Sequence, residues 1–95
     1  MLPDVPFGFI HMASALHELK RTQEARAVLL PIVHQFEGNR TIPYNLACYE
    51  CQLGNLKEAR RWLEKAIEVS GDSDVKLWAL EDPNLEPLWA NIGKI

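Results

Sequence analysis

The sequence repeats itself with a period of about 34 residues, and this period restricts the possible fold more than any other feature. Residues 6–39 and 40–73 align so that small, apolar and charged residues fall on residues of the same kind. A unit of this length cannot bury its apolar side chains alone, so neighbouring units must stack and share one core. The identical pairs are Ala13 and Ala47, Leu19 and Leu53, Glu24–Arg26 and Glu58–Arg60, and Leu29 and Leu63.

Each copy also has the residue spacing of paired helices. Apolar residues recur at intervals of three and four, which places them on one face of a helix. The chain is therefore expected to be all-α. The predicted helices cover about residues 6–19, 22–36, 41–53 and 55–70, followed by two shorter helices over about 75–80 and 85–92. Asp82 followed by Pro83 marks the start of the last of them.

Local sequence signals predict where the other helices begin and end. Thr22 is expected to cap the second helix, and Asn55 with Glu58 forms a start resembling a capping box for the fourth. Pro31 lies inside the second apolar pattern and is expected to kink or end that helix, because proline has no backbone N–H. Gly71 is expected to end the fourth helix in the left-handed conformation.

The pattern inside each copy is an ordered series of large and small positions. In the first copy it reads Phe9, Met12, Ala13, Leu16, Ala25 and Leu29. In the second copy it reads Pro43, Leu46, Ala47, Glu50, Ala59, Leu63 and Ala66. Period and pattern together resemble the tetratricopeptide repeat (TPR) family.

This resemblance implies an organisation for the whole chain. It implies a right-handed α-α superhelix, a TPR-like solenoid of two helix-turn-helix repeats with C-terminal capping helices. The chain is then a single domain over 1–95, with repeats at 6–39 and 40–73 and a degenerate third segment or cap at 74–95. The bulky apolar tail is expected to cover the open end of the stack, and the alternative is that it docks on another subunit.

The second copy departs from the family pattern at two positions. Pro43 replaces an aromatic residue near a helix start, where proline is tolerated. Glu50 replaces the second aromatic residue, which predicts either a thinner contact or a salt bridge.

Charge and hydropathy argue against two classes of partner. The net charge is -3 and Lys and Arg are interleaved with acidic residues, so the clustered basic face of a nucleic-acid-binding protein is not expected. No run reaches the length of about 18 apolar residues that a membrane span requires. Residues 1–4 lack the pattern of a signal peptide, so a cytoplasmic location is expected, and whether further repeats precede the chain stays open.

Cys48 and Cys51 form a C-x-x-C motif, which invites a metal or redox interpretation. A helix holds residues three apart on one face but is poorly suited to joining them in a disulfide, and a zinc site needs more ligands than this pair supplies. Convergence of His17 with both cysteines, with His11 nearby, is the alternative to two reduced and partly buried thiols. Reduced thiols, no metal and no cofactor are the expectation.

The sequence contains no motif for catalysis. A nucleophile elbow, a Gly-rich phosphate loop and a zinc-protease motif are all missing from it. The chain is therefore not expected to be an enzyme, and the resemblance instead implies a non-catalytic protein–protein interaction module.

In similar proteins the first helix of each repeat lines a concave groove that binds a partner peptide or helix. The equivalent residues here are nearly uncharged, which suits a partner with apolar anchors and backbone amides. The expected partner-binding residues are Phe7, Ile10, His11, Ser14, His17, Tyr44, Asn45, Cys48, Cys51 and Trp78.

Some members of the family clamp the C-terminal carboxylate of chaperone tails with basic residues on these helices. Asn45 matches one clamp position, but Ile10, Ser14, Val75 and Ala79 occupy positions where basic and polar clamp residues would stand. Binding of such tails is therefore not expected.

Two other functions stay open at this point. One is a self-associating structural scaffold, a homodimer joined through the ends of the stack. The other is a chaperone for a secreted protein.

Overall fold

The computed structural model describes residues 6–71 and 74–92, and these residues form only helices and turns. The predicted all-α fold is confirmed, while residues 1–4 lie outside the described part. The elements are α1 (Phe7–Glu18), α2 (Thr22–Leu29), the 3-10 helix η1 (Leu30–Gln35), α3 (Thr41–Gln52), α4 (Leu56–Ser70), α5 (Asp74–Glu81), the 3-10 helix η2 (Pro83–Leu88) and α6 (Trp89–Ile92).

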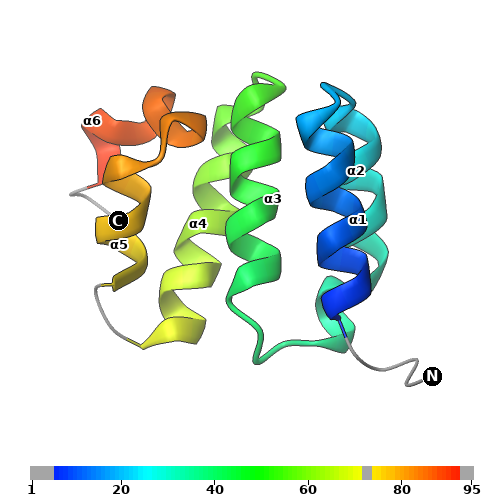
Figure 1. Ribbon diagram of the computed structural model, residues 1–95. Helices are drawn as coiled ribbons and strands as arrows, with labels where there is room; N and C mark the ends of the chain where they lie inside the picture. Colours follow the sequence, from blue (N-terminus) through cyan, green and yellow to red (C-terminus); the bar gives the residue numbers. More distant parts are fainter. Residues whose placement is uncertain (1–5, 72–73, 93–95) are drawn as a thin grey trace.

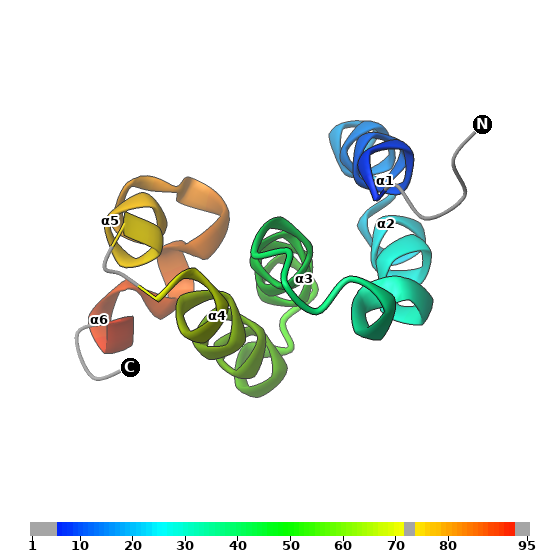
Figure 2. The same cartoon turned by 90° about the horizontal axis from the view of Figure 1, so that it is seen from below.

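The helices stack as hairpins in two layers. α1 packs against α2 and α3 against α4, and the two hairpins stand side by side (Figure 1). Seen along the helices, α1, α3 and α5 form one layer and α2, α4 and α6 the other (Figure 2). The first layer is curved, and α3 lies at the bottom of its concave side.

The core is centred on α3, which packs against both α2 and α4. Ala13, Ala25, Ala47, Ala59 and Ala66 are all fully buried. These small side chains let the helices approach closely. The large side chains between them are Leu29, Ile42, Leu46 and Leu63, which are also fully buried.

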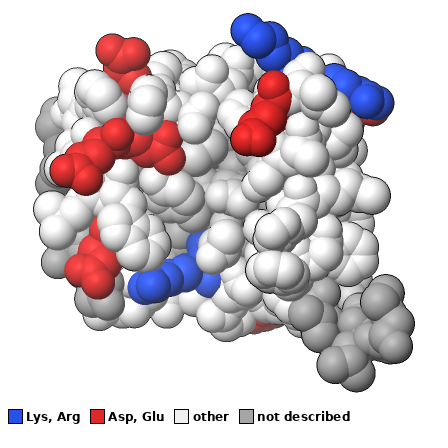
Figure 3. Space-filling view, in the orientation of Figure 1, with Lys and Arg blue, Asp and Glu red and all other residues white. Residues whose placement is uncertain are grey.

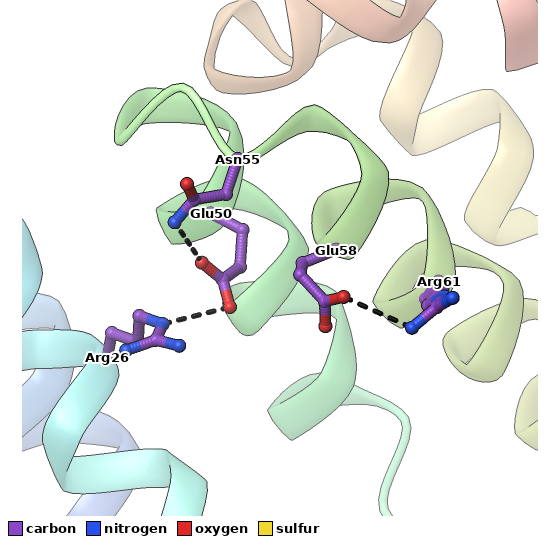
Figure 4. Close-up of polar contacts among 5 residues, drawn as sticks. All are labelled: Arg26, Glu50, Asn55, Glu58 and Arg61. Atoms are coloured by element: carbon purple, nitrogen blue, oxygen red, sulfur yellow. Dashed lines mark hydrogen bonds and ion pairs between the residues drawn. The ribbon is translucent and has the colours of Figure 1, made fainter.

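Glu50 confirms the salt bridge that was one of its two expected outcomes. The side chain is only 1% exposed, and its Oε2 accepts a hydrogen bond from Arg26 Nε at 2.9 Å. Its Oε1 accepts from Asn55 Nδ2 at 2.9 Å, so both carboxylate oxygens have donors (Figure 4). A buried carboxylate is tolerated when it is paired in this way. Glu50 thus links α2 to the turn between α3 and α4.

Two predicted helix caps are wrong. Thr22 is the first residue of α2 and its hydroxyl bonds His17 Nδ1 at 2.9 Å instead of a backbone N–H. Asn55 stands before α4 but makes no side-chain cap bond, because its amide is directed to Glu50. Glu58 pairs with Arg61 on the outer surface of α4 (Figure 4). In each case a tertiary contact takes the side chain away from the helix end.

Pro31 ends the second helix early, as predicted. α2 stops at Leu29, and the chain continues in the 3-10 helix η1 with Pro31 in its first turn. The row of buried apolar side chains nevertheless continues from α2 into η1, since Ile32 and Val33 are buried.

The C-terminal segment is only partly the cap that was expected. Gly71 ends α4 with φ of 74°, and Asp82 begins η2 by accepting from Asn84 N, both as predicted. A cap requires buried apolar side chains, and Leu85, Leu88 and Ile92 supply them. In contrast, α5 leaves three large side chains exposed, because η2 and not α5 packs against α3. These exposed residues are Leu77, Trp78 and Leu80.

Candidate functional site

A small pocket opens on the concave side between α1 and α3. Its volume is about 270 Å³. Its third wall is formed by residues 82–84, which are Asp82 between α5 and η2 and the first two residues of η2; they are called the turn below. The lining residues are Ser14, His17 and Glu18 of α1, Tyr44, Asn45, Cys48 and Tyr49 of α3, and Asp82 and Asn84 of the turn.

Asp82 is the centre of a polar network at this pocket. Its Oδ2 accepts hydrogen bonds from the Tyr44 hydroxyl at 2.9 Å and from the Cys48 thiol at 3.7 Å. Its Oδ1 accepts from the backbone N and the side-chain Nδ2 of Asn84, at 2.9 and 3.1 Å. One carboxylate therefore organises the turn with one oxygen and contacts α3 with the other.

The donors on α3 remain protonated over the ordinary pH range. Burial raises the pKa of the Tyr44 hydroxyl well above its usual value, and the neighbouring Cys48 and Asp82 add to the shift. Burial likewise raises the pKa of the Cys48 thiol, and the Asp82 carboxylate raises it further. Both groups therefore keep the proton that they donate to Asp82.

Asn84 extends the network across the pocket to α1. Its Oδ1 lies 3.1 Å from His17 Nε2, and its backbone oxygen accepts from Gln52 Nε2 at 3.0 Å. Because an amide oxygen is an acceptor, His17 carries a proton on Nε2, and its Nδ1 accepts from Thr22. This series of hydrogen bonds joins α1, α3 and η2. Apart from it, α1 and α3 make few contacts with each other.

A second cluster on this side joins α3 to α5. The Arg40 guanidinium lies over the Trp78 ring at 4.6 Å from its centroid, and the Tyr44 ring meets Trp78 edge-on at 6.3 Å. Trp78 is 44% exposed, so the cluster leaves an aromatic surface open to solvent. Such a surface is suited to stacking and cation–π contacts.

A family model described as the tetratricopeptide repeat matches residues 44–71, which cover most of α3 and all of α4. The matched segment is the helical hairpin at the centre of the stack. Residues 44–71 are thus similar to a tetratricopeptide repeat. Comparisons with curated proteins and with solved structures give no match.

TPR domains are in general non-catalytic modules for protein–protein interaction. The segment at residues 44–71 is similar to a repeat of that broad class. Within residues 6–71 and 74–92, no helix is long and apolar enough to cross a membrane.

The TPR fold brings only part of the predicted groove set together. Five of the ten residues line the pocket: Ser14, His17, Tyr44, Asn45 and Cys48. Trp78 joins them through its contact with Tyr44. Phe7 and His11 stack on each other with ring centroids 4.1 Å apart. Ile10 packs against the core, and Cys51 is buried and is not among the pocket's lining residues.

Both cysteines are buried, and His17 does not converge with them as the metal alternative requires. Cys48 and Cys51 are free thiols. His17 is directed to Asn84 and stacks on Tyr49 at 5.0 Å between ring centroids. In the part of the chain that the structure describes, no three His, Cys, Asp or Glu side chains gather closely enough to hold a metal ion.

The ten expected residues leave out five residues of this site: Glu18, Arg40, Tyr49, Asp82 and Asn84. Asp82 was interpreted only as a helix start, which it is, but its second oxygen reaches α3. The repeat offered one signal, because Asp82 stands one full period after Cys48, a predicted groove position. Nothing in the sequence signals that the turn folds back over α3.

Charge is distributed unevenly between the two layers. Among the residues of α1 and α3, the only Asp, Glu, Lys or Arg side chains are Glu18 and the buried Glu50. α4 instead carries three ion pairs on its surface: Glu58 with Arg61, Arg60 with Glu64, and Lys65 with Glu68. In Figure 3 the face of α1, α3 and α5 is mostly uncharged, with acidic side chains gathered on the α5 side.

A second hollow lies on the opposite side, between η1 and α4. Its volume is about 440 Å³. It lies beside η1, the 3-10 helix that has Pro31 in its first turn. Apolar side chains form its floor, namely Val33, Phe36, Pro43, Trp62 and Val69, and charged side chains of α4 form its rim.

Proposed function

We propose that this TPR protein binds an extended or helical segment of a partner protein in the concave groove formed by α1, α3 and α5. The proposal treats residues 1–95 as one domain, with repeats at 6–39 and 40–73 and a cap at 74–95. Its binding residues are those predicted from the sequence, apart from Cys51, whose side chain is buried in the core. Arg40 is added to the set, because its guanidinium lies over the Trp78 ring.

The observation that carries the proposal is the exposed cluster of Arg40, Tyr44 and Trp78. Tyr44 and Trp78 occupy the same position in successive helical units, one repeat period apart, and they meet edge to face. Aromatic and arginine side chains are the residues that most often dominate binding energy at protein interfaces. Here they remain partly open on a face that carries few charges.

Polar groups beside this cluster fit the backbone of a bound segment. Asn45 and Ser14 line the pocket, and Asn45 is only partly buried. A side-chain amide can both donate to and accept from a peptide backbone. A partner would therefore place apolar side chains near Trp78 and satisfy backbone groups near Asn45.

The test is selection of binding peptides from a random display library, followed by measurement of each affinity by fluorescence polarisation. Trp78→Ala should weaken binding by about tenfold or more, since removing a central aromatic residue is expected to have a large effect. Leu77→Ala is the matched control, because Leu77 is 59% exposed on the same helix but is not part of the cluster. It should change the affinity less than about twofold.

Two results would contradict the proposal. Peptides that bind Trp78→Ala and the wild type equally would place the interaction elsewhere, with the hollow between η1 and α4 as the first place to examine. Equal losses for Trp78→Ala and Leu77→Ala would mean that α5 contributes only general stability.

Self-association is a second candidate, and the outward face of α1 favours it. Phe9, Met12 and Leu19 are exposed there at helical spacing, whereas the equivalent face of α3 is covered by α2. A second copy could cover this face of α1 in the same manner.

Light scattering across a hundredfold range of concentration separates the two candidates. A dimer that Met12→Glu dissociates would favour self-association through α1. The mass of a single chain at every concentration would leave partner binding as the function.

A further inference from the structure

The turn at residues 82–84 lines the pocket on the concave side together with residues of α1 and α3. It comes from the C-terminal part of the chain, yet its contacts are made with α1 and α3. Asp82 accepts from Tyr44 and Cys48, while Asn84 meets His17 and accepts from Gln52 through its backbone.

These contacts resemble recognition of a ligand more than packing of a core. All of them are polar, and all but one come from residues that line the pocket. Pro83, between the two side chains, is exposed. The apolar side chains that hold η2 in place, Leu85 and Leu88, belong to the following residues and are buried, and Leu85 N donates to Asp82 O at 2.9 Å.

The turn is also organised before it meets the groove. Asp82 Oδ1 is bonded to both nitrogens of Asn84, at 2.9 and 3.1 Å, which leaves Oδ2 directed at α3. A short segment with a carboxylate and, two residues later, a side-chain amide can make this arrangement by itself. Preorganisation of this kind lowers the entropy lost on binding.

We propose that residues 82–84 are an internal ligand of the groove, and that the partner segment carries the same two groups and binds by displacing them. The partner is thus a protein segment with Asp followed two residues later by Asn, next to an apolar side chain that reaches Trp78. This proposal rests on the proposed function, because it assumes that the groove on α1 and α3 is the binding surface.

Displacement has a direct thermodynamic consequence. A groove that is occupied by its own turn binds an outside segment more weakly, in proportion to the fraction of molecules in which the turn has left. Removing the two side chains of the turn should therefore increase the affinity for an outside segment, whereas removing a residue of the binding surface would lower it.

The probe is a capped peptide with the sequence of residues 80–86, added to the full ¹⁵N-labelled chain and followed by amide chemical shifts. We expect the Asp82→Ala/Asn84→Ala variant to bind this peptide at least about tenfold more tightly than the wild type does. The shifted amides should be those of His17, Tyr44, Cys48 and Gln52. A peptide carrying Asp82→Asn should lose most of this binding, because it lacks the carboxylate that Tyr44 recognises.

Each other outcome overturns the proposal. Equal affinity for the wild type and the double variant would mean that the turn does not compete. Absence of shifts at millimolar peptide, or shifts away from the four named residues, would mean that the turn is structural only. If the double variant does not fold, the single variant Asn84→Ala replaces it. This variant keeps the Asp82 contacts with α3 and should bind the peptide more tightly than the wild type by a smaller factor. An affinity equal to that of the wild type would contradict the proposal.

Failure of this proposal can be distinguished from failure of the proposed function. Peptides from the display selection that depend on Trp78 but bind the wild type and the double variant equally would preserve the groove as the binding site and exclude the internal ligand. Selected peptides that bind independently of Trp78 would instead exclude the groove.

Discussion

The equivalent first helices of the two repeats have very different environments. α1 buries only Ala13, whereas α3 buries eight residues over the same number of turns. The two helices are both twelve residues long and are similar in composition. α3 is covered by α2 on one side and α4 on the other, while α1 has only α2 as an extensive neighbour. Burial in a repeat protein therefore follows largely from position in the stack, and related helices can be a core helix in one place and an exposed one in another.

The largest effect is expected when the side chain at the same position of each repeat is shortened to alanine. Leu46 and Met12 occupy the same repeat position, but Leu46 is fully buried and Met12 is 58% exposed. Leu46→Ala should lower the free energy of unfolding by about 2–5 kcal/mol, because it leaves a cavity. Met12→Ala should lower it by less than about 0.5 kcal/mol. Urea unfolding followed by circular dichroism measures both, and similar losses would show that α1 is covered in solution.

The second test concerns Glu50, whose counterpart in the first repeat is Leu16. Arg26→Ala removes a donor from the buried carboxylate and should destabilise the protein by about 1–3 kcal/mol, a range lowered by the partial exposure of Arg26.

Adding Glu50→Leu to that variant restores the first-repeat residue and should recover most of the loss, because an apolar side chain needs no donor. Thermal unfolding of both variants measures the recovery. A double variant less stable than Arg26→Ala alone would mean that the site requires a polar side chain for another reason.

The third test uses pH, because Cys48 of the second repeat replaces Ser14 of the first. The pKa of Cys48 is raised in the folded protein, so above the unfolded value of about 8.5 the unfolded chain holds fewer protons than the folded chain. Stability is thus unaffected below that pH and falls as pH rises, by up to about 1.4 kcal/mol per pH unit for each such group.

Cys51 has a raised pKa for the same reason and contributes in the same direction. Cys48→Ser should therefore reduce the slope above a pH of about 8.5 without removing it, as measured by urea midpoints at each pH. A slope unchanged by Cys48→Ser would place the titration elsewhere.

The smallest expected effect lies in the turns between the paired helices. Lys20 and Gly54 are equivalent, and both have positive φ, 64° and 85°. This conformation is unfavourable for a side chain with a Cβ, so Lys20→Gly should stabilise the protein by about 0.5–1 kcal/mol. Gly54→Ala should destabilise it by a similar amount. A destabilised Lys20→Gly variant would indicate that the Lys20 side chain contributes a compensating contact.

Features that depend on local chemistry and on the period could be predicted from the sequence. The helix positions, the early end of α2 at Pro31 and the left-handed cap at Gly71 all follow from neighbouring residues or from the repeat. For Glu50 a salt bridge was one of two expected outcomes, and the sequence did not identify Arg26 as its partner.

Features that depend on contacts between different helices could not be predicted in this way. Thr22 and Asn55 were assigned to helix caps because local rules favour them there, but His17 and Glu50 bind them instead. The approach of Asn84 to His17 joins residues 67 positions apart, and no local pattern specifies it. The burial of Cys51 likewise reflects how α3 packs between its neighbours.

The central claim is that the concave face of α1, α3 and α5 is the surface that binds the partner. The most direct test is to titrate a display-selected peptide into the ¹⁵N-labelled protein and to map the amide shifts. The account predicts that shifts gather on the concave residues of α1, α3 and α5, with the largest near Tyr44 and Trp78. Shifts that gather instead on η1 and α4 would contradict it and would assign binding to the opposite side of the stack.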